Sequence, residues 1–326
     1  MNGGTTLNLR VGDWVEVRSE REILATLDDK GCYEGMPFMA EMREFCGKRF
    51  RVYRRADKVC VEGAFMRRMT NAVTLEDVRC SGDEHGGCDR MCFIFWKEIW
   101  LRGAEPVEGG APQAKTKPAK HAPSTNVREK TYVCQSTELI RATRNLSSLA
   151  LGQYVRDVRS GNYSPVGVIR FLSIYLYNKV AYRMGRPEFG KPLGHADQTP
   201  KVSLRLQPGD LVEVRSRNEI QATLDRLGRN RGLHTDWESV RHAGERFHVQ
   251  RRVQRIIIES TGEMKEISDT VILEGAECSG MLRRGCARNC YPFWREAWLE
   301  KVEPADPRSA PVAPREEKVA EHVPTA

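Results

Sequence analysis

The sequence lacks a long apolar run. No stretch of its 326 residues approaches the roughly 20 consecutive apolar residues that a membrane-spanning helix needs. The opening residues, MNGGTTLNLRVGDW, lack the basic region and apolar core that mark a secretory signal. We therefore expect a cytoplasmic protein with no membrane association, and this expectation decides how its ten cysteines are interpreted.

The motifs of several large enzyme classes are also missing. The chain contains no P-loop, no HExxH, no GxSxG and no Rossmann fingerprint. Nor does one sign of charge dominate, because 52 Lys and Arg face 44 Asp and Glu, a formal net charge of +8. A mixed surface of this kind permits a polyanionic partner without indicating one. The basic strands that a nucleic acid could contact carry Arg49, Arg51, Arg54, Arg55, Arg246, Arg251, Arg252 and Arg255.

What the sequence does contain is an internal repeat. GDWVEVRSEREILATLD at 12–28 matches GDLVEVRSRNEIQATLD at 209–225, and VTLEDVRCSG at 73–82 matches VILEGAECSG at 271–280. The offset between the copies is 197 residues at Gly12 and 198 at Cys80. Self-similarity at a fixed offset is the signature of a duplicated structural unit.

Each copy has the pattern of short strands with one short helix. WVEVRS, RFRVYR and VTLEDV alternate apolar and polar residues, as half-buried strands do. Ser19 and Glu22, repeated as Ser216 and Glu219, form the capping-box pattern that starts a helix. Short strands with Gly-led turns favour a small barrel. We predict an α+β fold with two homologous small β-barrel, SH3-like modules, joined by a linker and a helical segment.

Composition divides the chain into five parts. The predicted parts are a first β-barrel and cysteine module (5–105), a flexible linker rich in Pro, Ala, Gly and Lys (106–126), a helical segment (127–190), a second module (200–304) and a disordered tail (305–326). Two or three helices are expected at about 130–186. Apolar residues recur there at three- and four-residue steps, which predicts a core-facing stripe of Val168, Phe171, Leu172, Tyr175, Leu176 and Val180.

Cysteines repeat with the spacing C-x7-C-x3-C in both copies. In a reducing compartment, patterned cysteines bind metal or react more often than they form disulfides. Flanking glycines allow a tight loop in which thiolates converge, and converging thiolates need a cation or a cluster to neutralise them. We predict a metal site in each copy, and the predicted ligands are Cys80, His85, Cys88, Cys92, Cys278, Cys286 and Cys290.

Two cofactors fit this pattern. Zinc takes four N or S ligands, which His85 completes in the first copy. Arg283 stands at the matching position in the second, so a fourth ligand there would be His242, His248 or water. Three cysteines with an open position also fit a [4Fe–4S] cluster. A disulfide with a spare thiol, or simple core packing, are the remaining interpretations.

The other cysteines and the tryptophans have plainer expected roles. Cys46 and Cys60 have no cysteine counterpart in the second copy, so a site shared by both copies would not require them. Cys32 and Cys134 are single occurrences and are expected to be structural. The repeated W-[KR]-E-x-W-L run is expected to bury its tryptophans, Trp96, Trp100, Trp294 and Trp298, in the core.

These stretches resemble those of an uncharacterised family of bacterial proteins found in actinobacteria and cyanobacteria. The family carries GD-x-VEVRS-x-x-EI-x-ATLD near a cysteine-rich loop ending in FW-[KR]-E-x-WL. Here the loops read CDRMCFIFWKEIWL and CARNCYPFWREAWL, and CQSTELIRAT at 134–143 is also similar. The resemblance implies a tandem architecture and supplies no mechanism.

Three functional hypotheses follow, and whether the protein is an enzyme stays open. The first is a binding or accessory component of a biosynthetic or regulatory assembly, with metal sites holding zinc or iron–sulfur and a protein or small-molecule partner. The second is an Fe–S or thiolate-dependent enzyme with sulfur or redox chemistry, in which Cys88 or Cys286 could react. The third is a nucleic-acid-binding tandem of SH3-like barrels.

Overall fold

The structure, a computed structural model, describes residues 7–62, 64–106 and 131–302. The fold is mixed α+β with antiparallel sheets, as the sequence predicts. The linker predicted at 106–126, apart from residue 106, and the tail predicted at 305–326 lie outside the described residues. Within the described part, no helix has both the length and the apolar character needed to cross a membrane.

The first copy of the repeat builds a five-stranded sheet in the order β8-β7-β4-β1-β9. A separate three-stranded sheet, β10-β6-β5, adjoins it. The strands, short helices and 3-10 turns of the first copy are β1 (Trp14–Val17), α1 (Glu20–Leu24), β2 (Cys32–Tyr33), β3 (Met36–Pro37), η1 (Ala40–Phe45), β4 (Arg49–Arg55), β5 (Lys58–Val61), β6 (Ala64–Arg68), β7 (Ala72–Arg79), η2 (Asp83–His85), β8 (Phe93–Lys97), η3 (Glu98–Trp100) and β9 (Leu101–Gly103).

The second copy builds a sheet of the same order, β18-β17-β14-β11-β19. Trp14 lies opposite Arg51 in the first sheet, and Leu211 lies opposite His248 at the equivalent place in the second. Its elements are β11 (Leu211–Val214), α5 (Arg217–Ala222), β12 (Arg229–Asn230), β13 (Leu233–His234), α6 (Trp237–Val240), β14 (Arg246–Arg252), β15 (Arg255–Ile257), β16 (Met264–Glu266), β17 (Thr270–Leu273), η4 (Met281–Arg283), β18 (Trp294–Arg295), η5 (Glu296–Trp298) and β19 (Leu299–Lys301).

Local sequence signals correctly predict features that the two copies share. Both predicted capping boxes are present, since the side chain of Ser19 accepts the N–H of Glu22 and that of Ser216 accepts the N–H of Glu219. The predicted burial of the tryptophans is also confirmed, because all four are fully buried: Trp96, Trp100, Trp294 and Trp298. Each copy therefore has its own buried core, which contains two of these tryptophans.

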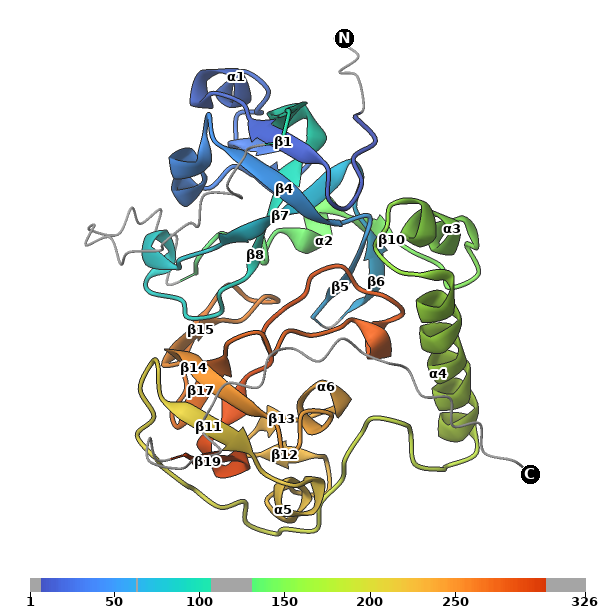
Figure 1. The fold of residues 1–326 in the computed structure, drawn as a ribbon, viewed down its shortest axis with the longest axis vertical. Coiled ribbons are helices and arrows are strands. Elements are labelled where there is room, and N and C mark those ends of the chain that lie inside the picture. Colours follow the sequence, from blue (N-terminus) through green and yellow to red (C-terminus); the bar gives the residue numbers. More distant parts are fainter. Residues whose placement is uncertain (1–6, 63, 107–130, 303–326) are drawn as a thin grey trace.

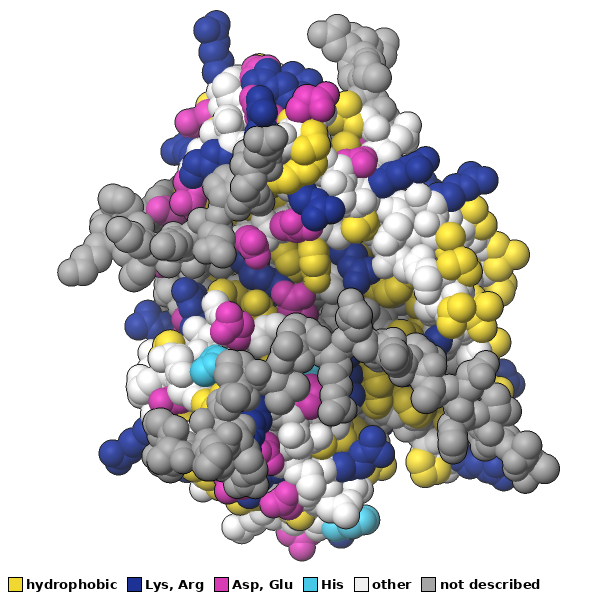
Figure 2. All heavy atoms as spheres, viewed as in Figure 1, with side chains coloured by type: hydrophobic (Ala, Val, Ile, Leu, Met, Phe, Trp, Pro, Cys, Tyr) yellow, Lys and Arg dark blue, Asp and Glu magenta, His cyan; other side chains and the backbone are white. Residues whose placement is uncertain are grey.

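The predicted helical segment contains α2 (Leu139–Ala142), the short strand β10 (Arg144–Asn145), α3 (Gly152–Arg159) and α4 (Pro165–Arg183). Helix α4 runs along one side of the molecule, beside both copies (Figure 1). Its predicted core stripe is only partly right: Val168 and Phe171 are buried, but Leu176 and Val180 are more than half exposed. Apolar side chains consequently gather on the surface over α4 (Figure 2).

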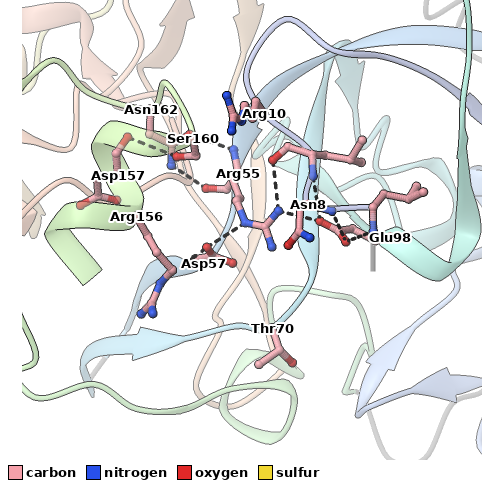
Figure 3. A network of polar contacts seen from close by, with 12 residues as sticks. Asn8, Arg10, Arg55, Asp57, Thr70, Glu98, Arg156, Asp157, Ser160 and Asn162 are labelled. Carbon is pink, nitrogen blue, oxygen red and sulfur yellow. Dashed lines mark hydrogen bonds and ion pairs between the residues drawn. The ribbon is translucent and has the colours of Figure 1, made fainter. Parts of the chain in front are cut away.

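Arg55 connects helix α3 to the first sheet (Figure 3). Its guanidinium lies 2.6 Å from Glu98 and 2.8 Å from Asp57, and its backbone N–H donates to the side chain of Asn162 just after α3. Glu98 also accepts the backbone N–H of Leu7. One buried carboxylate and one arginine thus hold the start of the chain, β4 and α3 together.

Two hairpins cross between the copies. The first hairpin (β5 and β6) and the second hairpin (β15 and β16) lie between the two five-stranded sheets (Figure 1). The N–H of Ala287 donates to the carbonyl of Lys58 at 3.0 Å, and the N–H of Asp89 donates to the carbonyl of Arg255 at 2.8 Å. The two hydrogen bonds occupy equivalent positions in the repeat: one joins the second loop to the first hairpin, and the other joins the first loop to the second hairpin. Each copy's hairpin therefore packs on the cysteine loop of the other copy.

Side chains repeat the same exchange. Arg288 donates to the carbonyl of Cys60 at 3.0 Å, and its counterpart Arg90 donates to the carbonyl of Ile257 at 2.8 Å. Both arginines also meet the buried Glu259, at 2.6 Å for Arg288 and 3.3 Å for Arg90. Glu259 therefore joins the two cysteine loops through one carboxylate.

Glu259 makes the stability of this junction depend on pH. Burial raises its pKa, but Arg288 and Arg90 outweigh burial and lower the pKa from 4.5 to about 2. A lowered carboxyl pKa contributes stability above pH 4.5, and this contribution is lost as the pH falls toward about 2. We expect Glu259→Gln to lower the free energy of unfolding at pH 7 by about 3–5 kcal/mol, because it leaves the buried Arg288 and the partly buried Arg90 without their carboxylate.

The difference in unfolding free energy between the wild type and this variant should shrink as the pH falls from 4.5, because the wild-type carboxyl then takes up a proton. Urea unfolding of both proteins at several values between pH 3 and pH 7 measures it. A difference that stays constant across that range would show that Glu259 is not ionised between the two arginines.

Candidate metal centre

The two cysteine loops, the first loop (residues 80–92) and the second loop (residues 278–290), have the same backbone. The N–H of Cys80 donates to the carbonyl of Cys92, and the N–H of Cys278 donates to that of Cys290, both at 2.8 Å. Both loops make a left-handed turn, at Gly82 and at Gly280. The duplicated sequence is therefore a duplicated loop, whatever each copy binds.

Gly82 is required by close contact as well as by its backbone angle. Its φ is +84°, and a Cβ placed there would lie 1.9 Å from the carbonyl oxygen of Cys88. The equivalent Cβ on Gly280 would lie 2.4 Å from the carbonyl oxygen of Cys286. Each glycine thus lets the loop fold back on its second cysteine.

Three side chains meet at the first loop. The thiol of Cys80 donates to Oε1 of Glu41 at 2.8 Å, Nδ1 of His85 lies 3.4 Å from the same oxygen, and Sγ of Cys80 lies 4.0 Å from Nδ1. Among the described residues, these are the His, Cys, Asp or Glu side chains that form a group of three ligand atoms within 4.8 Å of one another. Glu41, from η1, was not predicted from the sequence.

Burial makes this group electrostatically unusual. Burial raises the pKa of Glu41, but hydrogen bonds from His85 and Cys80 outweigh it and hold that pKa below its usual range. Burial and the Glu41 carboxylate both raise the pKa of the Cys80 thiol. Oε2 of Glu41 is buried and has no hydrogen-bond partner. A buried carboxylate with one unpartnered oxygen is a group that a cation would satisfy.

The remaining cysteines of the first loop line a cavity beside this group. Its volume is about 30 Å³, and the cysteines on its wall are Cys80, Cys88, Cys92 and Cys134. His85 lines it as well. Cys134, expected to be a structural residue, therefore faces the predicted site. Cys88 and Cys92 adjoin the three-residue group without belonging to it, so their role as ligands stays a prediction.

The second loop is arranged differently. Glu238 stands 197 positions after Glu41, and its carboxylate accepts the N–H and the hydroxyl of Ser279, both at 2.8 Å. Arg283 replaces the histidine, and among the described residues no group of three ligand atoms forms here. Metal binding at Cys278, Cys286 and Cys290 thus stays a prediction.

Among the described residues, neither histidine considered as a fourth ligand forms a group of three ligand atoms with the second-loop cysteines. Nδ1 of His242 lies 2.6 Å from Glu245, and its ring packs against Phe247 and Trp294. Nδ1 of His248 lies 3.1 Å from the carbonyl of Gly209. His242 occupies the position of the core residue Phe45, 197 residues earlier, which explains its place in the core rather than at the loop.

Cys60 lies beside the second loop, a position that the sequence did not predict for it. Its Sγ lies 3.2 Å from Sγ of Cys286, and its N–H donates to the same sulfur at 3.1 Å. The contact lowers the pKa of Cys60, whereas burial and then Cys60 raise the pKa of Cys286, because one proton between two sulfurs stabilises one thiolate only. The counterpart of Cys60 in the second hairpin is Ile257, which faces the first-loop cavity.

The sequence contained one usable signal for Glu41. It recurs as Glu238 at the same 197-residue offset as the surrounding repeat, in segments that otherwise differ. No such signal exists for Cys60 or Cys134, which have no cysteine counterpart. The crossing hairpin places Cys60 beside the second loop, and the segment before α2 places Cys134 beside the first loop. The spacing of the cysteines in the sequence predicts neither position.

No protein-family model matches the chain, and no curated protein and no solved structure matches it. The geometry of the residues is therefore what any functional conclusion rests on.

Gly82→Ala should disrupt the first loop. We expect a loss of about 3 kcal/mol or more in unfolding free energy, because the new Cβ meets a backbone oxygen that cannot move alone. Gly87→Ala is the matched control: φ there is +77°, but nothing lies within 4 Å of its Cβ, so only the backbone cost of about 1–2 kcal/mol remains. Equal losses in urea unfolding would show that the close contact does not form.

Proposed function

We propose that the protein binds a metal ion at Glu41, Cys80 and His85. The observation that carries the proposal is the convergence of three ligand atoms of different chemistry, from the buried Glu41 and His85 and the partly buried Cys80. One of these atoms belongs to a carboxylate whose other oxygen has no partner. This set differs from the one predicted from the sequence, because it combines Cys80 and His85 of the loop with a carboxylate from outside it.

Zinc fits this donor set best. Tetrahedral zinc with bonds of about 2.0–2.3 Å holds its ligand atoms about 3.3–3.6 Å apart. Of the three separations here, 3.4 Å lies within that range, 2.8 Å lies below it and 4.0 Å lies above it, so small side-chain shifts suffice. A fourth ligand would come from water or from the cysteines that line the adjoining cavity.

A second candidate is an iron–sulfur cluster, for which the cavity, at about 30 Å³, would have to widen. Four cysteines surround it, and the ligands of a [4Fe–4S] cluster bind different irons, which places their sulfurs further apart than those around one ion. Backbone N–H groups of Arg90 and Ile257 bond Cys88, and those of Ser136 and Thr137 bond Cys134. Such bonds tune cluster thiolates. In this arrangement Cys134, not His85, would complete the set.

We further propose that the two repeats are SH3-like modules that act as a binding or accessory component. The exposed face of α4 supports this role because it is apolar, and between residues 147 and 186 the only acidic residue is the buried Asp157. A protein surface with apolar and acidic side chains would complement it.

Nucleic-acid binding receives less support, since several of the basic-strand arginines already pair within the chain. Arg49 pairs with Glu16, Arg246 with Glu213 and Arg251 with Asp89.

Metal analysis of the purified protein tests the proposal. We expect one zinc ion for each chain after exchange into metal-free buffer, and at least a tenfold loss of zinc affinity in Glu41→Gln and in His85→Ala, because each removes a direct ligand. Competition with a chromogenic chelator measures the affinity.

Glu238→Gln is the matched control, because it changes the equivalent carboxylate of the second copy and should leave zinc binding at the first loop unchanged. Full zinc retention in both first-copy variants would contradict the proposal. Visible absorbance near 400 nm after anaerobic purification that Cys134→Ser abolishes would replace zinc with the cluster.

A further inference from the structure

Cys60 and Cys286 are far apart in the chain and in contact in the fold. They are separated by 226 positions, and their sulfurs lie 3.2 Å apart. One belongs to the first hairpin and the other to the second loop, so the contact crosses between the copies. Among the described residues, no third ligand atom lies within 4.8 Å of both sulfurs to make a metal-binding group with them. The geometry is that of a pair of thiols.

We propose that Cys60 and Cys286 form a redox pair, which a hydroperoxide converts into a disulfide that locks the two copies together. This proposal does not depend on metal binding at the first loop, whose ligands are different residues.

Exposure assigns the order of the two steps. Cys60 is partly exposed, whereas the Cys286 side chain is almost fully buried. A small oxidant therefore reaches Cys60 first. Cys286 then lies directly behind it, the arrangement of a sensing cysteine with its resolving partner.

The chemistry balances with the hydroperoxide as the oxidant. The thiolate of Cys60 attacks the terminal peroxide oxygen, the O–O bond breaks, and the alkoxide or hydroxide leaves with a proton, which gives the sulfenic acid of Cys60. The sulfur of Cys286 then attacks the sulfenic sulfur, the S–O bond breaks, and water leaves with the thiol proton. Two thiols lose two electrons in total and the peroxide gains them.

The first loop shows that this contact is specific to one copy. Ile257 stands where Cys60 stands in the other hairpin, and its N–H bonds Cys88 as that of Cys60 bonds Cys286. The backbone exchange is thus the same in both places, and of the two hairpins only the first carries a thiol at this position.

Peroxide treatment of the reduced full-length protein tests the pair. We expect a small excess of hydrogen peroxide to consume two of the ten thiols and to produce a Cys60–Cys286 cross-linked peptide in a non-reducing digest. The oxidised protein should also unfold at a higher temperature, because the new bond closes a long loop in the unfolded chain. Adding a dithiol should reverse both changes.

Single variants separate the pair from general oxidation. In Cys286→Ser, Cys60 should accumulate as a sulfenic acid that a dimedone probe traps, and in Cys60→Ser the cross-link should vanish while Cys286 stays reduced. Ile257→Cys should build an equivalent cross-link to Cys88 in the first loop. The proposal fails if Cys60 stays reduced while Cys46 is oxidised, or if Cys60→Ser releases a bound metal ion, which would make Cys60 a ligand.

Discussion

The reciprocal packing of each hairpin on the other copy's cysteine loop is the constraint on which the rest of the structure depends. It is built from paired backbone bonds, Ala287 to Lys58 and Asp89 to Arg255, and from two arginines that share Glu259. Because a buried ion pair stabilises only when its hydrogen bonds are satisfied, this junction is sensitive to any change in its geometry. Each cysteine loop is in contact with the hairpin of the other copy.

This exchange changes how the duplication is understood. Two copies joined by a linker would be expected to act as independent binders. Here the second hairpin places Ile257 against the first loop, and the first hairpin places Cys60 against the second. The first loop has a histidine beside a metal-compatible carboxylate, whereas the second has an arginine and a partner thiol. We propose that the two copies of the loop serve different sulfur chemistry.

Much of the local structure could be predicted from the sequence, and the assembly could not. Alternation and capping residues located β1, β4, β7 and both short helices, because those signals act within a few residues. The apolar periodicity of α4 predicted that Leu176 and Val180 are buried, but both are exposed. Periodicity shows which side chains share a face of a helix and does not show whether another element covers that face. The contact between Cys60 and Cys286 joins residues that are 226 positions apart, and the sequence has no local signal for it.

The most direct test of this account is to produce residues 1–106 and 131–326 as separate chains. If each loop needs the other copy's hairpin, each fragment alone should give a poorly dispersed NMR spectrum, and mixing the two should restore a dispersed spectrum and a one-to-one complex. A fragment 1–106 that is folded and monomeric by itself, with no affinity for 131–326, would contradict the reciprocal exchange.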